Sequence, residues 1–201
     1  MATYTKTQGT SVLTLQSVAS GAVLISTAID VSGKIAVTLF IHFGRRATTA
    51  LTVGCQIRIE GSSKSSGDGH WYPLFIYTTD VAAAESEAVT GTNNAGQNVI
   101  TVASTTNLSA GDVIYIDNST IGNSEWHRIK SVVTNTSITL EDNLAHAQNS
   151  GSATIYDQAQ IFRAVDINCR ALGRLRVVVD DSGTGQAIAI EVDMVSADSF
   201  A

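Results

Sequence analysis

The hydrophobic pattern of the chain consists of short segments in which apolar residues occupy every second position. The clearest segments are Ile35–Phe43, Leu51–Glu60, Arg174–Asp181 and Gln186–Val195. This period of two is typical of β-strands that bury one face. In the first two segments the odd-numbered positions carry the apolar side chains, so these positions are expected to face a core. The pattern therefore predicts long strands that pack as one sandwich.

Further strands are predicted in both halves of the sequence. They cover Val12–Leu15, Ala22–Ile25, Trp71–Thr79 and Gln160–Cys169. Pro73 cannot donate a hydrogen bond to a neighbouring strand, so its segment is expected to begin near this residue or to lie at a sheet edge. The loop DSGTG between Arg174–Asp180 and Gln186–Val195 predicts a hairpin.

The middle of the chain, Asn98–Tyr156, carries a complete set of strand and turn signals of its own. The expected strands are Asn98–Ala103, Val113–Asp117, Glu125–Val133, Ser137–Leu140 and Ala153–Tyr156. About five short strands are enough for a small barrel or sandwich. The preceding segment Val81–Thr90 is rich in Ala and Glu and lacks the period of two, so a linker or a single helical turn is expected there.

These patterns predict an all-β protein whose main domain is interrupted. Residues 1–82 and 158–201 are expected to form a discontinuous, antiparallel, jelly-roll-like β-sandwich, and residues 83–157 a small β-barrel or sandwich inserted into it. Insertions are tolerated at exposed loops whose ends lie close together. Two or three domains in series are the alternative, but residues 158–201 alone offer only three strands, which favours the insertion.

The low and negative charge of the chain argues against some classes of binding partner. The net charge is −6, and only 15% of the residues are charged. Electrostatic binding of nucleic acid requires a basic stripe, so no nucleic-acid partner is expected. The adjacent basic pair Arg45–Arg46 is more simply a solvated turn than a phosphate site. No apolar run approaches the length of a membrane helix, and no membrane partner is expected.

The N-terminal sequence and the cysteines bear on the compartment. MATYTKTQGT lacks the basic start and the apolar stretch of a secretory signal, so the chain is expected to stay in the cytosol or to leave it by another route. Cys55 and Cys169 share the inward parity of their strands. Buried free thiols are favoured for this pair, a disulfide is the alternative, and a metal or reactive role is least expected.

The sequence contains no motif that nominates a catalytic centre. None of the histidines, His42, His70, His127 and His146, has a second ligand at metal-binding spacing. The acidic run at Asp180–Gly183 is interpreted as a turn, with a weak cation site as the alternative. No nucleophile elbow or phosphate-binding loop is present. The chain is therefore expected not to be an enzyme and to use no cofactor or metal.

Aromatic residues are the remaining candidates for a functional surface. Several of them follow one another in the segment WYPLFIY, where packing in a core or a subunit interface is favoured over a platform for sugar stacking. A further tryptophan flanks a loop of the insert and is a second candidate contact. Together with the basic pair, the candidate interaction surface comprises Trp71, Tyr72, Phe75, Tyr77, Arg45, Arg46 and Trp126.

Parts of the sequence resemble virion proteins of tailed bacteriophages. NVITVASTTNLSAGDVIYIDN (Asn98–Asn118) and EWHRIKSVVTNTSITLEDNLAHAQNSGS (Glu125–Ser152) resemble the small β modules of phage capsid, tail and fibre components. The segment RLRVVVDDSGTGQAIAIEVDMV (Arg174–Val195) resembles phage head decoration or cement proteins. The insert and the flanking sandwich together cover most of the chain.

The resemblance implies a non-enzymatic structural protein that binds the major capsid protein and stabilises the shell. Such proteins form symmetric homo-oligomers, and a homotrimer is expected. The protein is then made in the host cytoplasm and resides on the capsid surface of the virion. The alternative is a tail, baseplate or fibre component whose insert binds a host-surface glycan through Trp126 or Tyr115. A hydrolase with a dispersed active site is the third hypothesis.

Overall fold

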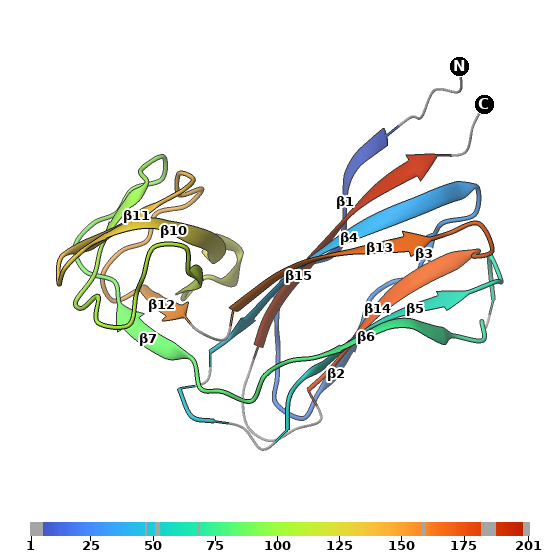
Figure 1. Cartoon of the computed structure of the whole chain (residues 1–201), viewed down its shortest axis with the longest axis horizontal. Helices are drawn as coiled ribbons and strands as arrows, with labels where there is room; N and C mark the ends of the chain where they lie inside the picture. Colours follow the sequence, from blue (N-terminus) through green and yellow to red (C-terminus); the bar gives the residue numbers. More distant parts are fainter. Residues whose placement is uncertain are drawn as a thin grey trace.

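The computed structural model describes residues 6–46, 48–50, 53–67, 69–157, 160–181 and 188–198. Strands β1 to β15 and one short 3-10 helix, η1 (Ile121–Asn123), make up the regular structure in these ranges (Figure 1). The strands form three sheets, and all of their pairings are antiparallel. The prediction of an all-β, antiparallel fold is confirmed.

Two of the sheets form a sandwich. The first has the order β1 (Lys6–Val18), β15 (Ile188–Asp198), β4 (Lys34–Arg45), β13 (Gln160–Asn168). The second has the order β2 (Val23–Ile25), β14 (Arg174–Asp180), β5 (Gln56–Ser62), β6 (Tyr72–Thr78), and β3 (Ile29–Asp30) also pairs with β14. Numbered in chain order, with β2 and β3 counted together, the sandwich has eight strands in the described ranges. The β1 sheet then has the strand order 1-8-3-6 and the β2 sheet has the order 2-7-4-5, which is the topology of a jelly roll.

The inward residues of these two sheets share one hydrophobic core. In β4 the odd-numbered positions face inward as predicted, and Val37, Leu39, Ile41 and Phe43 are each at most 2% exposed. Other strands add further fully buried side chains to this core, among them Ile57, Ile59, Leu175, Val177, Val179, Ile188, Ile190 and Val192. Each fully buried aliphatic side chain stabilises the fold by roughly 1.5–3 kcal/mol.

Both cysteines lie in this core as free thiols. Cys55 is 0% exposed and Cys169 is 1% exposed. Burial raises the pKa of the Cys55 thiol to about 12 and that of Cys169 to about 11. Because the thiolate is the reactive and metal-binding form, both side chains are chemically inert. The prediction of buried free thiols is confirmed.

The predicted hairpin between the last two strands is wrong. β14 pairs with β2, β3 and β5, whereas β15 pairs with β1 and β4, so the connection passes from one sheet to the other. Most of the DSGTG loop lies in residues 182–187, outside the described residues. The period of two determines which face of a strand is buried but not which strand is its neighbour. A glycine-rich loop therefore fits a hairpin and a crossing between sheets equally well.

Two single residues test the strand predictions around β5 and β6. Val53, which was expected to face the core, is 52% exposed, because β5 begins only at Gln56. Pro73 does lie on an edge strand, since β6 is the last strand of its sheet. The register of the β5–β6 pair shifts between Ile59 and Glu60, beside the partner of the proline.

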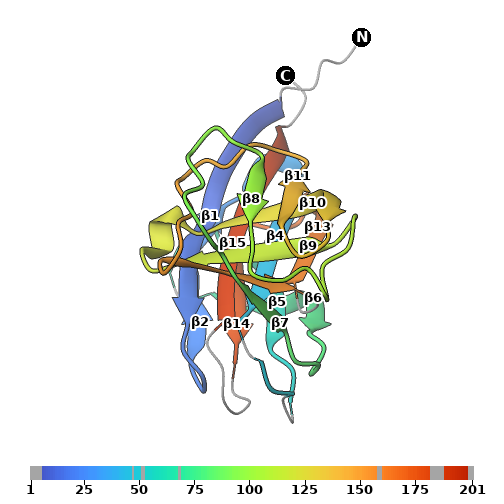
Figure 2. The ribbon, with the colours of Figure 1, turned by 90° about the vertical axis from the view of Figure 1, so that its left-hand side faces the viewer.

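The third sheet contains only strands between residues 85 and 157. Its order is β7 (Glu85–Ala88), β12 (Ala153–Asp157), β9 (Val113–Asn118), β10 (Glu125–Val133), β11 (Ser137–Leu140), β8 (Val99–Thr101). A β-bridge between Val89 and Val102 joins the two ends of this path, so the sheet curls into a small barrel (Figure 2). Its interior is aliphatic and includes Ile100, Ile114, Ile116, Ile129, Ile138, Leu140 and Ile155, all 0% exposed.

Strand β7 corrects the expectation of a linker or helical turn at residues 81–90. Ala and Glu have weak strand propensities, but pairing with β12 outweighs them. Ala84 and Val89, which flank the strand, are each 2% exposed and tie the segment to its surroundings.

The third sheet, called the insert below, begins and ends at one place. Glu85 at the start of β7 is the register partner of Asp157 at the end of β12. The strands on either side of the insert, β6 and β13, are edge strands of the two sandwich sheets. The insert projects from one end of the sandwich, whereas the start of β1 and the end of β15 lie at the opposite end (Figure 1).

Candidate interaction surfaces and the domain junction

The outer face of the β2-β14-β5-β6 sheet has a charged centre that is paired within itself. Arg58 and Glu60 alternate with the inward residues of β5 and therefore point outward. Arg58 Nη1 lies 3.3 Å from Asp180 Oδ2, and Arg176 Nη2 lies 2.7 Å from Glu60 Oε2. Arg58 Nε also lies 3.3 Å from Glu60 Oε1. A surface whose charges are already paired can be covered by a partner that brings no charges of its own.

Trp71 belongs to this charged centre. The guanidinium carbons of Arg174 and Arg176 lie 5.3 Å and 4.3 Å from the centroid of its ring, which is the geometry of cation–π contacts. The arginines therefore occupy part of the indole surface. This residue is a component of the face rather than an isolated aromatic platform.

Exposed apolar side chains line the two edges of the same sheet. On β2, Val23 and Ile25 are 53% and 51% exposed. On β6, the exposed fractions are 62% for Tyr72, 42% for Leu74 and 52% for Ile76. We call these two groups the edge strips. Edge strands with exposed apolar residues promote pairing or packing with another chain unless something covers them.

Phe75 and Tyr77 lie on the other side of β6 and pack against the sandwich core. Arg163 of β13 stacks over both rings, at 5.3 Å from the centroid of Phe75 and 4.8 Å from that of Tyr77. The two edge strands are thus joined across the open side of the sandwich. The alternating aromatic segment therefore divides between two faces, and Tyr72 is its most exposed member.

Arg45 was grouped with the candidate surface, but it is 0% exposed, which contradicts that prediction. Its Nη1 donates to the carbonyl of Ala82 at 2.8 Å, and its Nη2 donates to Thr79 Oγ1 at 3.1 Å. Its own carbonyl accepts a hydrogen bond from Gln160 Nε2 at 2.9 Å. Arg45 thereby contacts both chain segments that lead into and out of the insert. The odd-numbered parity of β4 would have indicated this inward position.

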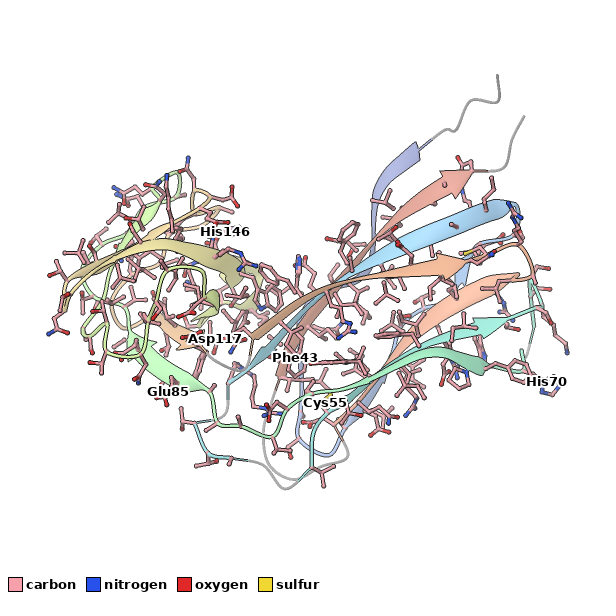
Figure 3. All side chains as sticks on the ribbon, in the orientation of Figure 1. Phe43, Cys55, His70, Glu85, Asp117 and His146 are labelled. Carbon is pink, nitrogen blue, oxygen red and sulfur yellow. The ribbon has the colours of Figure 1, made fainter. Side chains whose placement is uncertain are left out.

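Arg46 has the opposite parity and connects the two domains at the surface. Its Nη1 lies 3.1 Å from Asp117 Oδ2 on β9, and its Nη2 donates to Ser17 Oγ on β1 at 3.0 Å. The partly exposed pair is a modest contributor to stability, of about 0–1 kcal/mol. Asp117 lies on the side of the insert that faces the sandwich (Figure 3).

Aromatic rings fill the space between the insert and the sandwich. Trp126 of β10 lies with its ring centroid 4.9 Å from that of Tyr115 and 5.5 Å from that of His42 on β4. Gly44 permits this approach, because a Cβ there would lie 3.1 Å from Tyr115 Cγ and 2.6 Å from Gln160 Oε1. Tyr115 is 0% exposed, so it is unavailable for the glycan contact that the sequence allowed.

A cleft of about 320 Å³, called the junction cleft below, opens beside these rings. The sandwich contributes residues of β1, β4 and β15, and the insert contributes β10, the segment at and just after η1, and the loop that carries Ala145 and His146. Its lining residues are Leu15, His42, Glu191, Gly122, Ser124, Glu125, Trp126, Ala145 and His146. Nothing in the sequence pattern linked these residues, because they come from both domains.

A second buried charge, Asp181, lies near Arg45 at the insert-proximal end of the sandwich. Its side chain is 1% exposed, and burial raises its pKa to about 6, an effect that the nearby Arg45 partly offsets. The turn predicted at Asp180–Gly183 can be followed only as far as Asp181, because Ser182 and Gly183 lie outside the described residues. The described residues contain no group of three or more His, Cys, Asp or Glu side chains placed to hold a metal ion.

No helix among the described residues is long and apolar enough to cross a bilayer. His70, one of the isolated histidines, is exposed at the far end of the sandwich from the insert (Figure 3).

Comparison with known proteins gives phage proteins as structural neighbours. No protein-family model matches the chain, and no curated protein sequence matches it. The tailspike protein gp49 from Pseudomonas phage LKA1 aligns with 37% of this chain and 14% of its own, at 27% identity and a TM-score of 0.30. The phage phi92 endosialidase aligns with 62% of this chain and 20% of its own, at 11% identity and a TM-score of 0.27.

A capsid protein, VP17 of bacteriophage P23-77, aligns over nearly the whole length of both chains. The alignment covers 98% of this chain and 97% of VP17, at 12% identity and a TM-score of 0.20. The chain thus spans a fifth or less of the tailspike and the endosialidase.

Proposed function

We propose that the protein is a non-enzymatic structural component of a phage particle that binds the capsid surface and stabilises the shell. The observation that carries this proposal is the pair of edge strips on one sheet, with a self-paired charged centre between them. Stable association between proteins requires apolar area that water can be removed from, and charges that are not left unpaired. The β2-β14-β5-β6 face offers both.

The positions of the strips favour a ring of identical subunits. Val23 and Ile25 lie at one edge of the sheet, and Leu74 and Ile76 lie at the other. Two different surfaces at opposite edges allow head-to-tail contacts, which close into a ring when the rotation between subunits permits it. A homotrimer, as the resemblance implies, is the arrangement we propose.

The division of the chain into two domains supports attachment at one end and display at the other. The insert projects from one end of the sandwich (Figure 1). Anchoring the sandwich on the major capsid protein leaves the insert free to face outward. This arrangement supports our proposal that the protein lies on the capsid surface of the virion.

The test compares phage particles that contain the protein with particles from which its gene has been deleted. We expect the deleted particles to release their DNA at a lower temperature, measured with a DNA-binding dye, and added purified protein to restore the wild-type temperature. Protein with Ile76→Lys should fail to restore it, whereas the matched insert variant Val133→Lys should succeed. Absence of the protein from purified particles, or an unchanged release temperature, contradicts the proposal.

The second candidate function is a tail, baseplate or fibre component that binds a host-surface glycan. The junction cleft, with Trp126 in its lining, is the observation that favours it. Labelled antibody and electron microscopy of intact particles separate the two functions. Label on the tail supports this candidate, and label on the head supports the capsid proposal.

A further inference from the structure

We infer that the junction cleft is a binding site for a neutral carbohydrate. This inference does not rest on the proposed structural role, but it deepens the second candidate function, which assigns a glycan to the same cleft. The cleft is formed by both domains, and its lining combines an aromatic ring, carboxylates and histidines. Carbohydrates present apolar C–H faces beside hydroxyl groups, and they are matched by aromatic rings next to hydrogen-bonding side chains. Pockets of roughly 300 Å³ and larger hold small-molecule ligands.

The insert side of the cleft is held rigid by hydrogen bonds to Glu125. Its Oε2 accepts from the Ala145 amide at 2.8 Å and contacts His127 Nε2 at 2.9 Å. Its Oε1 accepts from Gln148 Nε2 at 2.7 Å and from the His146 amide at 3.2 Å. The loop that carries His146 is thereby fixed against β10. A binding surface that is already ordered loses little entropy when a ligand arrives.

The protonation of Glu125 follows from the same contacts. Burial alone would raise the pKa of this carboxyl, but the hydrogen bonds from His127, Ala145 and Gln148 outweigh burial, and the pKa is lowered. The carboxylate stays ionised, and its bonds to the protein fully engage it. It is therefore a positioning residue for the loop, rather than a contact for the ligand.

Free hydrogen-bonding capacity remains on two other residues of the cleft. His146 Nδ1 is buried and has no hydrogen-bond partner among the described residues. Glu191 on β15 is part-exposed, and its nearest ion-pair contact is His42 Nδ1 at 3.5 Å from Oε2. Buried polar atoms without partners are uncommon in proteins, and a ligand or water that supplies the missing bond removes their cost. Sugar hydroxyls donate and accept, so they suit both residues.

Charge selects a neutral ligand. Glu125 and Glu191 line the cleft, and Asp193 follows two residues after Glu191 on the same face of β15. Anionic sugars are disfavoured by carboxylates at close range. His42, which stacks on Trp126 and lies beside Glu191, completes the sandwich side of the site.

The test uses tryptophan fluorescence of the whole chain. Trp71→Phe leaves Trp126, in the cleft, as the single tryptophan. We expect a saturable fluorescence change when neutral mono- to tetrasaccharides of glucose, galactose, mannose and N-acetylglucosamine are titrated. Matched oligosaccharides that carry sialic or uronic acids should bind about tenfold more weakly. No saturable change with any neutral sugar up to about 10 mM overturns the inference, because binding weaker than this is below about 3 kcal/mol.

Two variants locate the binding. Glu191→Gln retains the shape of the side chain but removes its charge. We expect this variant to bind the sugar about tenfold more weakly, because a hydrogen bond to a charged group is lost. His146→Ala should weaken binding by a similar factor. Glu141→Gln, on an exposed residue of the insert outside the cleft, is the control and should bind as the parent does. Far-UV circular dichroism confirms the fold of each variant.

The outcomes separate this inference from the proposed function. Binding that Glu191→Gln and His146→Ala leave unchanged lies elsewhere and overturns the assignment to the cleft. Equal binding of acidic and neutral sugars overturns the assignment of ligand class. Neither result affects the heat stability of phage particles, which tests the structural role independently.

Discussion

The sandwich and the insert differ in how their exposed apolar residues are distributed. The exposed large apolar residues of the insert, Val99, Ile121 and Val133, lie on three separate elements. Of those of the sandwich, Val23, Ile25, Tyr72, Leu74 and Ile76 lie on β2 and β6, at the two edges of one sheet, and Phe40 and Phe162 lie on neighbouring strands of the other sheet. Val53 and Val81 lie in the segments that flank β5 and β7. Scattered apolar residues are normal on soluble domains, whereas grouped ones indicate a contact. The surface of the insert is therefore that of a domain exposed to solvent, whereas the sandwich carries a surface suited to contact with another protein.

The two domains also differ in how completely their buried polar groups are hydrogen-bonded or paired. Gln148 of the insert is 0% exposed, and its side chain bonds to Asn123, Glu125 and Asn118. In the sandwich, the buried charges Arg45 and Asp181 lie near each other without a close ion pair between them. Paired networks specify one rigid structure, whereas incompletely paired charges store free energy that a change in pH can release.

The largest test of the comparison replaces one fully buried side chain in each domain. We expect Ile116→Ala to destabilise the insert by about 2–5 kcal/mol and Leu39→Ala to destabilise the sandwich by a similar amount. Urea unfolding is followed by tryptophan fluorescence in two variants. In Trp126→Phe the remaining Trp71 reports on the sandwich, and in Trp71→Phe the remaining Trp126 reports on the insert. Ile116→Ala should move the Trp126 transition and leave the Trp71 transition in place. Equal shifts of both transitions would show that the domains unfold as one unit.

The next largest effect is a pH dependence that resides in the sandwich. Asp181 has its pKa raised to about 6 from 3.8, so the folded state holds the proton more tightly than the unfolded state. The contribution of Asp181 to the free energy of unfolding should therefore be full below about pH 4, and it should fall by up to about 3 kcal/mol as the pH rises to about 6 and above. Asp181→Asn should remove this fall and stabilise the protein at pH 7.

Thermal and urea unfolding between pH 4 and pH 8 measure this dependence. Asp166→Asn, on the exposed face of β13, is the matched control and should keep the slope of the parent. A slope that survives in Asp181→Asn would assign the dependence to another group.

Contact between the domains depends on the absence of a side chain at Gly44. In Gly44→Ala, the new Cβ meets Gln160 Oε1 at 2.6 Å, Tyr115 Cγ at 3.1 Å and Trp126 Nε1 at 3.2 Å. We expect a loss of about 1–3 kcal/mol, typical of an overpacked interface, together with a red shift of Trp126 fluorescence. Gly122→Ala is the control, because a Cβ there meets nothing within 4 Å. Unchanged emission in Gly44→Ala would show that the interface opens or repacks without strain.

The sequence predicted the insert better than the sandwich for a physical reason. Glu125–Val133 and Ser137–Leu140 were predicted to the residue, because a tight turn with Asn135 at φ 50° separates two short alternating runs. In the sandwich, the strands were found but the pairing of β14 with β15 was wrong, since alternation carries no information about the neighbouring strand.

The prediction of the candidate surface was limited in the same way, because alternation shows which face of a strand is buried but not which residues meet in space. Parity could have assigned Arg45 to the interior, because it continues the inward series that ends at Phe43 in β4. The junction cleft could not be predicted, since His42, Glu191 and His146 are brought together only by the contact between two domains. Residues that act together across domains leave no spacing signal in the sequence.

The smallest effect on stability, and the sharpest test of the comparison, comes from the edge strips. Ile76→Lys and Ile25→Lys each place a charge on an exposed position, so the free energy of unfolding should change by no more than about 0.5 kcal/mol. Light scattering after size exclusion should nevertheless report the mass of a single chain in place of a trimer, because a lysine facing an apolar strip leaves a desolvated charge unpaired. Val133→Lys, equally exposed on the insert, should keep the trimer mass. If all three variants retain the parent mass, the grouping of apolar residues on β2 and β6 serves no contact between copies, and the strips are left to contact the shell alone.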